Sequence, residues 1–512
     1  MKYIIKEINI DAGEYTVILN EKDAKEMGVR SLERVKLITP SKSVTAVVET
    51  TSSVVNEGEV GVLCKVLEEL KGEEETVPDS VTIMPTGRPH SVELIKSKID
   101  GKTLTAEEIR EIVTDIASHN LTDIELTAYV MGCQMKGMTL DETTYLTKAM
   151  VETGDTIKLD KSPIFDFHSI GGAPGNKITF LVVPIVAAAG LLIPKTSSRA
   201  ISSACGTADI FETIARVSLT KEEIKNITEK IGGVIAWGGN VNFAPADDII
   251  IRVEYPLSLD PYSQLIASVM AKKKAVGANF FLLDIPIGPG TKVTETDLAN
   301  KYANDFIEIG RRLDMHVECA ITYGGQPIGK HIGPLLEAKE AMMCLEGKAP
   351  STSVVEKSVA MAGILLEMGG IHNGKQAARD ILDSGKALAK FREILEAQDG
   401  NPDLKSEDIM PGEFKAEILA PSDGYVIFLD NKKLVRVARA AGSPRDKGAG
   451  LVFKKKRGEK VDRGEPMFEI YADNKHKLEE AVNLSNLIKP YQVEGMIIAH
   501  IPGPGRSPSY QK

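Results

Sequence analysis

The chain has 512 residues, which at roughly 150 residues per domain suggests about three domains. Hydrophobic residues make up 43% and charged residues 26%, a balance that excludes wholesale disorder. The formal net charge of −10 offers polyanions no general attraction, so we expect no nucleic-acid partner.

Residues 1–85 alternate short β-type runs with turn residues, and they predict a small β-rich N-terminal domain. The candidate strands are Tyr15 to Asn20, Val35 to Ile38 and Val44 to Val48. A break follows at Val77-Pro78-Asp79, and a second at residues 85–89, where prolines flank a Thr-Gly-Arg turn. We expect a hinge there.

A helical layer follows, chiefly over residues 86–160. Three capping-box patterns occur in succession: Thr105-x-x-Glu108, Thr122-x-x-Glu125 and Thr139-x-x-Glu142. Each places a hydroxyl beside the first-turn amides and a carboxylate that reaches back, just before an amphipathic run. The patterns predict three helices joined by short turns.

Apolar strands alternate with helices after residue 161, which is typical of α/β domains. The expected strands are Ile193 to Thr196, Val234 to Ala236, Ala278 to Ile285 and His316 to Ile321. The expected helices are Lys177 to Ala189, Lys221 to Ile231, Asp297 to Leu313, Pro334 to Leu345 and Val354 to Glu367. We assign residues 161–413 to an α/β lobe, so that 86–413 is a central catalytic region whose active site lies in the cleft between its two lobes.

Residues 414–512 return to short strands with Gly-rich turns, then a helix at 474–486 and a last strand at 495–501. The fold class we predict is therefore multidomain α/β: a β-rich N-terminal domain, a helical layer plus a mixed α/β sheet domain, and a C-terminal α+β barrel-like domain.

The chain offers few signs of a membrane, of secretion or of a metal. The apolar run at 180–194 is broken by Pro184 and Gly190 and falls short of the roughly 20 residues that span a bilayer. No signal-peptide core opens the chain, and the five cysteines form no C-x-x-C pair, so we expect a cytoplasmic protein without a membrane partner. The eight histidines show no metal-ligand spacing, and we expect no metal.

The most unusual segment is His168-Ser-Ile-Gly-Gly-Ala-Pro-Gly-Asn-Lys177. A Gly-rich turn before a helix lets backbone amides converge on an anion. The segment is neither a Walker A loop nor a dinucleotide fingerprint, and a tight turn without ligand is an equally good interpretation of the loop alone.

A second polar cluster spans residues 195–207, between an apparent strand and a helix that we expect Asp209 to cap. Hydroxyls and Arg199 at the carboxyl end of a strand suit a phosphate or a ribose. The alternative is a solvated Ser-rich loop. Two anion-competent loops about thirty residues apart are more informative than either one.

Two further segments carry candidate site residues. Asp260-Pro261 is typical of a helix N-cap followed by Pro at the first helical position, and a plain cap is the stronger interpretation of Asp260. Gln264, Ser268 and Lys272 then fall four apart on an otherwise apolar helix, which suggests a polar stripe facing a cleft. Lys292 follows an apolar strand on a Gly/Pro loop, where a mobile cation can reach a phosphate or remain solvated.

Several motifs in order resemble the thymidine/pyrimidine nucleoside phosphorylase family. They are Asp166-x-His168-Ser-Ile-Gly-Gly172, Ser197-x-Arg199, Gly206-Thr207, Trp237-Gly-Gly239, Ala244-Pro-Ala-Asp-Asp248, Asp284-Ile-Pro-x-Gly288 and residues 438–450. The resemblance covers residues 86–505 and implies a nucleoside phosphorylase/phosphoribosyltransferase-like fold. It is strongest to the archaeal AMP phosphorylase branch, because of the N-terminal extension, the loop 171–177 and the Ser198-Arg-Ala-Ile-Ser-Ser203 stretch.

The resemblance implies phosphorolysis of AMP, and also of CMP and UMP, to free base and ribose 1,5-bisphosphate. Inorganic phosphate is then a co-substrate, and no cofactor is expected. Asp260 is implied as the proton donor to the leaving base. The implied substrate-binding residues are Gly172, Ser198, Arg199, Ala200, Ile201, Ser202, Ser203, Thr207, Ser268 and Lys292, with Ser169 and Thr179 as weaker phosphate candidates.

One departure from the family pattern concerns charge. Phe167 stands where nucleoside phosphorylases place a lysine beside the histidine, so another cation must neutralise the attacking phosphate. Lys177, Lys195 and Lys292 are the candidates that the sequence offers.

Three other interpretations stay open at this point. One is a pyrimidine or thymidine nucleoside phosphorylase, and another is a phosphoribosyltransferase of the anthranilate type, which would require magnesium and diphosphate. A third concerns the tail, where residues 415–472 resemble a biotinyl/lipoyl-like barrel with a candidate turn at 430–433 that lacks the flanks of a modified lysine. We interpret that tail as structural, and the resemblance implies a homodimer or larger homo-oligomer.

Overall fold

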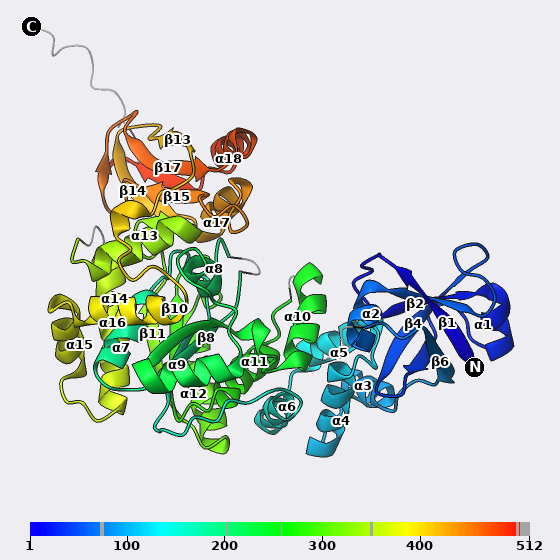
Figure 1. Ribbon diagram of the computed structural model, residues 1–512. Helices are drawn as coiled ribbons and strands as arrows, with labels where there is room; N and C mark the ends of the chain where they lie inside the picture. The colour runs from blue at the N-terminus through cyan, green and yellow to red at the C-terminus, as the bar shows by residue number, and fades with distance from the viewer. Residues whose placement is uncertain (72–75, 201–202, 258, 349–351, 498–500, 502–512) are drawn as a thin grey trace, which may run out of the picture. The chain divides into compact units, whose positions relative to one another are not determined.

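The computed structural model describes residues 1–71, 76–200, 203–257, 259–348, 352–497 and 501 (Figure 1). The chain divides into two compact units. The first unit is Met1–Asp155 with Asn242–Ala275, and the second unit is Thr156–Val241 with Val276–Lys512.

The N-terminal part of the first unit is a closed β-barrel with strand order β1-β5-β2-β4-β3-β6. Its elements are β1 (Lys2–Ile8), β2 (Thr16–Asn20), α1 (Glu21–Met27), β3 (Arg34–Ile38), β4 (Ser43–Thr51), β5 (Glu59–Leu63), α2 (Cys64–Lys71) and β6 (Ser80–Thr86). Alternate residues of β4 (Val44, Ala46 and Val48) point into the barrel core, as the two-residue period of a half-buried strand requires. The predicted β-rich character of this region is confirmed.

In its described residues, the rest of the first unit is helical: α3 (Ser91–Ile99), α4 (Ala106–Ala117), α5 (Asp123–Lys136), α6 (Leu140–Glu152), α10 (Pro245–Leu257) and α11 (Tyr262–Ala275). All three predicted capping boxes are present, at the starts of α4, α5 and α6. Residues 242–275 fall in this unit and not in the α/β lobe to which we assigned them. The reason is packing, because Ile250 of α10 and Ala267 of α11 are buried in the core of the helical layer.

The second unit is built on parallel strands: β7 (Phe165–Ser169), β8 (Ile193–Ser197), β9 (Gly233–Trp237), β10 (Phe280–Ile287) and β11 (His316–Tyr323). The order β11-β10-β7 forms one sheet and β8-β9 another, and a parallel bridge between Ile164 and Leu192 links the two. Since all pairings are parallel, the carboxyl ends of these strands share one edge. The four predicted strands are confirmed, whereas β7 was not predicted.

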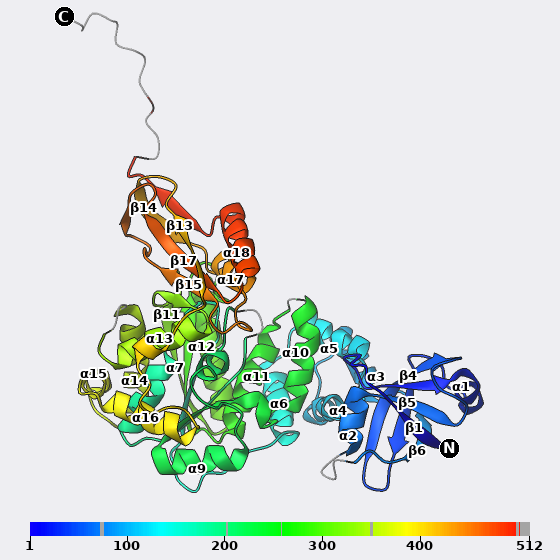
Figure 2. The same cartoon turned by 45° about the horizontal axis from the view of Figure 1, so that its top comes forward.

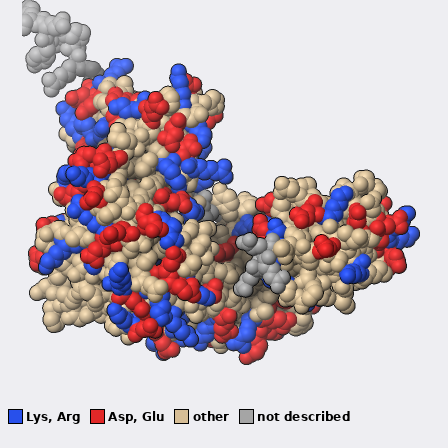
Figure 3. Space-filling view, in the orientation of Figure 1, with Lys and Arg blue, Asp and Glu red and all other residues tan. Residues whose placement is uncertain are grey.

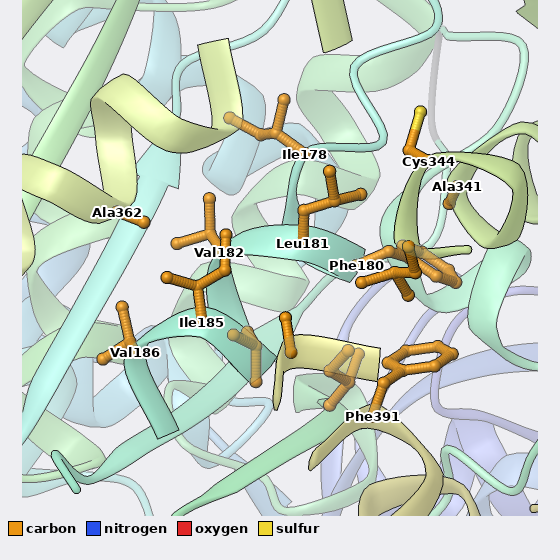
Figure 4. Close-up of a cluster of buried hydrophobic side chains, with 14 of the residues drawn as sticks. Ile178, Phe180, Leu181, Val182, Ile185, Val186, Ala341, Cys344, Ala362 and Phe391 are labelled. Atoms are coloured by element: carbon orange, nitrogen blue, oxygen red, sulfur yellow. The ribbon is translucent and has the colours of Figure 1, made fainter. Parts of the chain in front are cut away.

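The helices of this sheet region are α7 (Thr179–Ala188), α8 (Thr207–Phe211), α9 (Lys221–Ile231), α12 (Thr296–Arg312), α13 (Pro334–Leu345), α14 (Thr352–Met368), α15 (Gly374–Asp383) and α16 (Lys386–Ala397), with short 3-10 turns at Gly238–Asn240 and Ser406–Asp408. Helix α7 is buried from Thr179 to Ala187 and lies beside α14 and α16 (Figure 2). Phe180 of α7 packs against Phe211, with ring centroids 5.6 Å apart. It also packs against Phe391 at 5.9 Å (Figure 4). This core fixes the helix that follows the Gly-rich loop.

The C-terminal part has two antiparallel sheets, of order β12-β15-β17-β13 and β16-β14-β18, with two helices. The elements are β12 (His331–Ile332), β13 (Phe414–Leu419), β14 (Gly424–Leu429), α17 (Asn431–Ala440), β15 (Gly450–Phe453), β16 (Lys460–Val461), β17 (Pro466–Ala472), α18 (Lys475–Ile488) and β18 (Tyr491–Glu494). Because β12 comes from the central region, the tail shares a sheet with the α/β lobe.

Two predictions for the tail are wrong. The candidate turn at 430–433 is the start of α17, where the Asp430 side chain caps the helix by accepting from the Lys433 amide at 3.1 Å. The last strand is Tyr491–Glu494, paired with β14, and not residues 495–501, of which 498–500 lie outside the described residues. The strand is only four residues long and directly follows Pro490, so the local pattern did not mark it.

Surface charge is mixed on the face that Figure 3 shows, where Lys and Arg alternate with Asp and Glu. No helix in the described part of the chain has both the length and the hydropathy to cross a membrane.

Candidate active site

The Gly-rich loop after β7 lies against the loop after β10. The Ile170 amide donates to the Asp284 carbonyl at 3.0 Å, and Gly171 and Gly172 have φ angles of 94° and 95°. A Cβ atom on Gly172 would lie 2.5 Å from the Lys292 amide nitrogen, so only glycine permits this approach. The structure thus brings together two predicted site residues, Gly172 and Lys292, both of them exposed at the carboxyl edge of the sheet.

Polar side chains behind this loop form a connected network. The Asn176 Nδ2 atom donates to Ser169 Oγ at 3.1 Å and to Asp284 Oδ2 at 3.4 Å. The Thr322 hydroxyl donates to Asp284 Oδ1 at 2.5 Å, and Lys357 Nζ lies 2.7 Å from Asp284 Oδ2. Ser169 is a predicted phosphate candidate, and the other four residues of the network were not predicted.

Two of the three lysines proposed to replace the missing cation are buried and engaged. Lys177 is fully buried, 2.6 Å from Glu340 Oε2, and also donates to the Ile328 and His331 carbonyls. Lys195 donates to the Thr196 carbonyl at 2.8 Å, and its ammonium lies 5.2 Å from the centre of the Phe167 ring.

These contacts make Lys177 and Lys195 structural residues of the sheet edge. Lys292 is the exposed one of the three. Thr179, the weaker phosphate candidate, is buried at 3% exposure as the first residue of α7.

The hydroxyl-rich loop after β8 folds back on itself. The Gly206 backbone packs on Ser198 and Ala200, because a Cβ there would lie 2.7 Å from the Ser198 carbonyl oxygen. The Asp209 carboxylate accepts from the Ala200 and Gly206 amides at 2.7 and 2.8 Å. Asp209 is therefore the third residue of α8 and not its N-cap as predicted; Gly206 occupies that position.

Of the predicted binding residues in this loop, Ser198 and Ser203 are exposed, and Arg199, Ala200 and Thr207 are half-buried. Ile201 and Ser202 lie outside the described residues. Ser203 Oγ donates to the Cys205 carbonyl at 3.2 Å, and Ser197 Oγ is buried, so among the described residues Ser198 and Ser203 are the exposed serines of this loop.

Arg199 is held by neighbours of the loop. Its guanidinium makes a two-point ion pair with Glu212, at 2.7 and 2.5 Å, and stacks 4.7 Å from the centre of the Trp237 ring. Lys447 of the tail adds a second cation 3.0 Å from Glu212. The hydrogen bond from Arg199 is the main cause that lowers the pKa of Glu212 to about 2, so the pair is ionised at neutral pH. Arg199 thus fixes the loop after β8 to Glu212 and Trp237 through its ion pair and its ring contact.

Side chains of the C-terminal domain donate hydrogen bonds to backbone carbonyls of the loops after β8, β10 and β11. Ser443, buried at 4% exposure, donates to the Ala204 carbonyl at 2.8 Å, and Arg439 donates to the Ser203 carbonyl at 3.1 Å. Asn431 donates to the Gly324 carbonyl at 2.8 Å and to the Pro289 carbonyl at 3.3 Å. Sequence reasoning missed these positioning residues, although residues 438–450 formed one of the family motifs.

In the first unit, Asp260 is exposed just before α11, which starts at Tyr262, one residue later than predicted. Ser268 donates to Asp247 Oδ2 at 2.7 Å, and Lys272 lies 2.7 Å from the same carboxylate. The polar stripe therefore pairs with α10, and the prediction that it faces a cleft is not supported at these two residues.

Gln264 completes the stripe and behaves differently. It is 3% exposed, and neither of its amide atoms has a hydrogen-bond partner in the described part of the chain. No group of three or more His, Cys, Asp or Glu side chains among the described residues is arranged to hold a metal ion.

Three family models match the chain. Residues 92–154 match the helical bundle domain of a glycosyl transferase family, residues 161–388 the a/b domain of that family, and residues 425–489 the pyrimidine nucleoside phosphorylase C-terminal domain. Anthranilate phosphoribosyltransferase from Thermus thermophilus shares the fold at a TM-score of 0.50 and 18% identity, over 60% of this chain and 99% of that one. The fold is that of a glycosyl transferase with helical bundle and a/b domains.

Curated relatives match almost the whole chain. AMP phosphorylase from Methanosarcina mazei is 50% identical over 506 residues, which cover 98% of this chain and 99% of the relative. AMP phosphorylase 1 from Archaeoglobus fulgidus is 51% identical, with 95% and 96% covered, and the Thermococcus kodakarensis AMP phosphorylase is 48% identical, with 98% and 99% covered. The chain belongs to the AMP phosphorylase family, which confirms the resemblance seen in the sequence.

Proposed function

We propose that this protein cleaves AMP with inorganic phosphate, releasing adenine and ribose 1,5-bisphosphate. The observation that carries the proposal is the close approach of the Gly-rich loop 169–177 to Lys292, at the carboxyl end of β10. The described hydroxyl-bearing residues 198–200 and 203–207 follow β8, which is linked to this sheet by a parallel bridge between Ile164 and Leu192. Nearly full-length similarity to proteins named AMP phosphorylase supports the same conclusion.

Cleavage of the glycosidic bond builds positive charge on the ribose, so the enzyme must hold an anionic nucleophile beneath C1′. Backbone amides of the Gly-rich loop and the Ser169 hydroxyl are preorganised donors for the attacking phosphate. The exposed hydroxyls of Ser198 and Ser203 are suited to the 5′-phosphate, because they donate without adding charge. Lys292, exposed beside Gly172, supplies a cation to the phosphate held by the Gly-rich loop.

The leaving base must also receive a proton, and we assign this role to Asp260. Asp260 is exposed, just before the start of α11. A positioned carboxyl is one of the groups that serve as general acid, and Asp260 is the residue that the family resemblance implies for this step.

The decisive experiment incubates the purified protein with AMP and phosphate in the presence of EDTA and identifies the sugar product. We expect adenine and ribose 1,5-bisphosphate in equal amounts. Product formation that depends on magnesium and diphosphate would instead indicate a phosphoribosyltransferase, and absence of any phosphate consumption would refute the proposal.

Asp260→Asn tests the proton donor. Asparagine retains the shape of the side chain but carries no titratable proton, so we expect turnover of AMP to fall by about 100-fold or more while binding is retained. Asp100→Asn, at an exposed helix end in the same unit, is the matched control. Full activity of Asp260→Asn would remove this residue from the mechanism.

A pyrimidine nucleoside phosphorylase is the second candidate, favoured by the match of residues 425–489 to the C-terminal domain of those enzymes. Comparing thymidine and uridine with AMP, CMP and UMP under the same conditions separates the two. Equal cleavage of nucleosides and nucleotides would favour the second candidate. We further expect a cytoplasmic homodimer or larger homo-oligomer, and light scattering on the purified protein measures the latter.

A further inference from the structure

A buried carboxylate lies directly behind the loop that we propose binds the attacking phosphate. Asp284, near the end of β10, is 0% exposed, and its own carbonyl accepts from the Ile170 amide of that loop. An anion so close to a phosphate site works against binding, because Coulomb repulsion is weakly screened in the protein interior. Something must neutralise Asp284.

Lys357 of α14 is that group. Its side chain is 9% exposed, and its Nζ atom lies 2.7 Å from Asp284 Oδ2. Among the described residues, Asp284 is the one carboxylate within ion-pair distance of Lys357. Burial lowers the pKa of Lys357 and Asp284 opposes that shift, so the ammonium depends on this single partner.

The pair also determines which way a neighbouring amide faces. An ionised carboxylate accepts hydrogen bonds and donates none, so Asn176 must turn its Nδ2 atom toward Asp284. The same Nδ2 atom donates to Ser169 Oγ at 3.1 Å. The Ser169 oxygen is thereby used as an acceptor, and its O–H is directed to another acceptor.

We infer that Lys357 is a positioning residue for the attacking phosphate. By pairing with Asp284, it holds the carboxylate toward which the Asn176 amide donates, and so presents the Ser169 O–H to the phosphate. This inference rests on the proposed function. The pair supplies no net charge to the phosphate in place of the lysine missing at Phe167; it removes the repulsion that an unpaired Asp284 would exert there. Lys357 acts through Asp284 and does not touch substrate.

The first test measures KM for phosphate and for AMP in Lys357→Met. We expect KM for phosphate to rise about 10-fold or more, because the hydrogen bond from the Ser169 O–H to the charged phosphate is lost. KM for AMP should change less than about threefold. Lys357→Arg, which keeps the charge, should stay within about threefold of the original protein for both. Lys375→Met, an exposed lysine of α15, is the matched control.

The second test is a double-mutant cycle with Asp284→Asn. If Lys357 acts only through Asp284, adding Lys357→Met to Asp284→Asn changes KM for phosphate by less than about twofold. An equal loss in both backgrounds would mean that Lys357 binds phosphate itself, and the inference would be overturned. The comparison of Asp284→Asn with the double variant stands even if Lys357→Met alone does not fold.

The two failures are distinguishable. If the unmodified protein consumes no phosphate with AMP, the proposed function is wrong. If it does, and Lys357→Met has the same KM for phosphate as Lys375→Met, only the inference about Lys357 is wrong.

Discussion

Removal of Lys177 tests how the end of the Gly-rich loop is held. Lys177 and Glu340 are both fully buried, with 2.6 Å between Nζ and Oε2, and Lys177 also donates to two carbonyl oxygens at 3.2 and 3.1 Å. Lys177→Met keeps the length and packing of the side chain but leaves Glu340 as a buried charge. We therefore expect a large loss of stability rather than a specific loss of phosphate affinity.

The size of the stability loss depends on the hydrogen bonds that Glu340 retains in Lys177→Met. Breaking a buried pair by removing one partner costs about 3–5 kcal/mol. Glu340 still accepts from the Lys330 and His331 amides at 2.8 and 3.1 Å, which partly compensates its charge. We expect a decrease of about 3 kcal/mol in the free energy of unfolding, at the lower end of that range.

Urea unfolding followed by tryptophan fluorescence measures this loss, because Trp237 is the single tryptophan and lies in the second unit. Lys460→Met is the control: its partner Asp462 is 3.6 Å away and both side chains are largely exposed, so we expect a change below about 1 kcal/mol. Adding Glu340→Gln to Lys177→Met should recover part of the loss. A Lys177→Met variant as stable as Lys460→Met would refute the argument.

Two further predictions concern the first unit and the tail. Burial is the main cause that lowers the pKa of His119 to about 4. Between pH 4 and about 6.5 the unfolded chain therefore binds more protons than the folded protein. The free energy of unfolding should be highest above this range and should decrease as the pH falls through it. Hydrogen exchange of residues 1–155 measures how this free energy of unfolding depends on pH. We expect the dependence to be lost in His119→Asn, and an unchanged dependence would contradict the role given to His119. Ser443→Ala removes the hydrogen bond to the Ala204 carbonyl and should raise KM for AMP about fivefold. Ser384→Ala, at an exposed serine, is the control. Equal KM values for the two variants would contradict this prediction.

Local signals in the sequence predicted the helical layer well. Each capping box joins residues three apart, so the pattern in the chain is already the contact in the structure. Strand β7 was missed because Asp166 and His168 interrupt an otherwise apolar run, although Asp166 is fully buried 3.7 Å from Lys195. Its polarity is compensated by a partner from another strand, which no local pattern can show.

The candidate site divides in the same way. The meeting of Gly172 with Lys292 follows from parallel strands whose ends share an edge, and it could be expected once the strands were placed. The roles of Lys177, Lys357 and Asn431 depend on partners more than 70 residues away along the chain. For the same reason the sequence did not place α10 and α11 in the helical layer.

The tail's hold on the substrate loops has a consequence for how this enzyme family can be cut and recombined. A protein shortened at residue 413 would keep Ser203, Ala204 and Gly324, yet lose the side chains of Arg439, Ser443 and Asn431 that anchor their carbonyls. Exchanging residues 414–497 between two relatives should therefore transfer substrate affinity along with the tail. The substrate affinity of such a chimaera would then depend on Arg439, Ser443 and Asn431 as much as on the residues that contact the nucleotide.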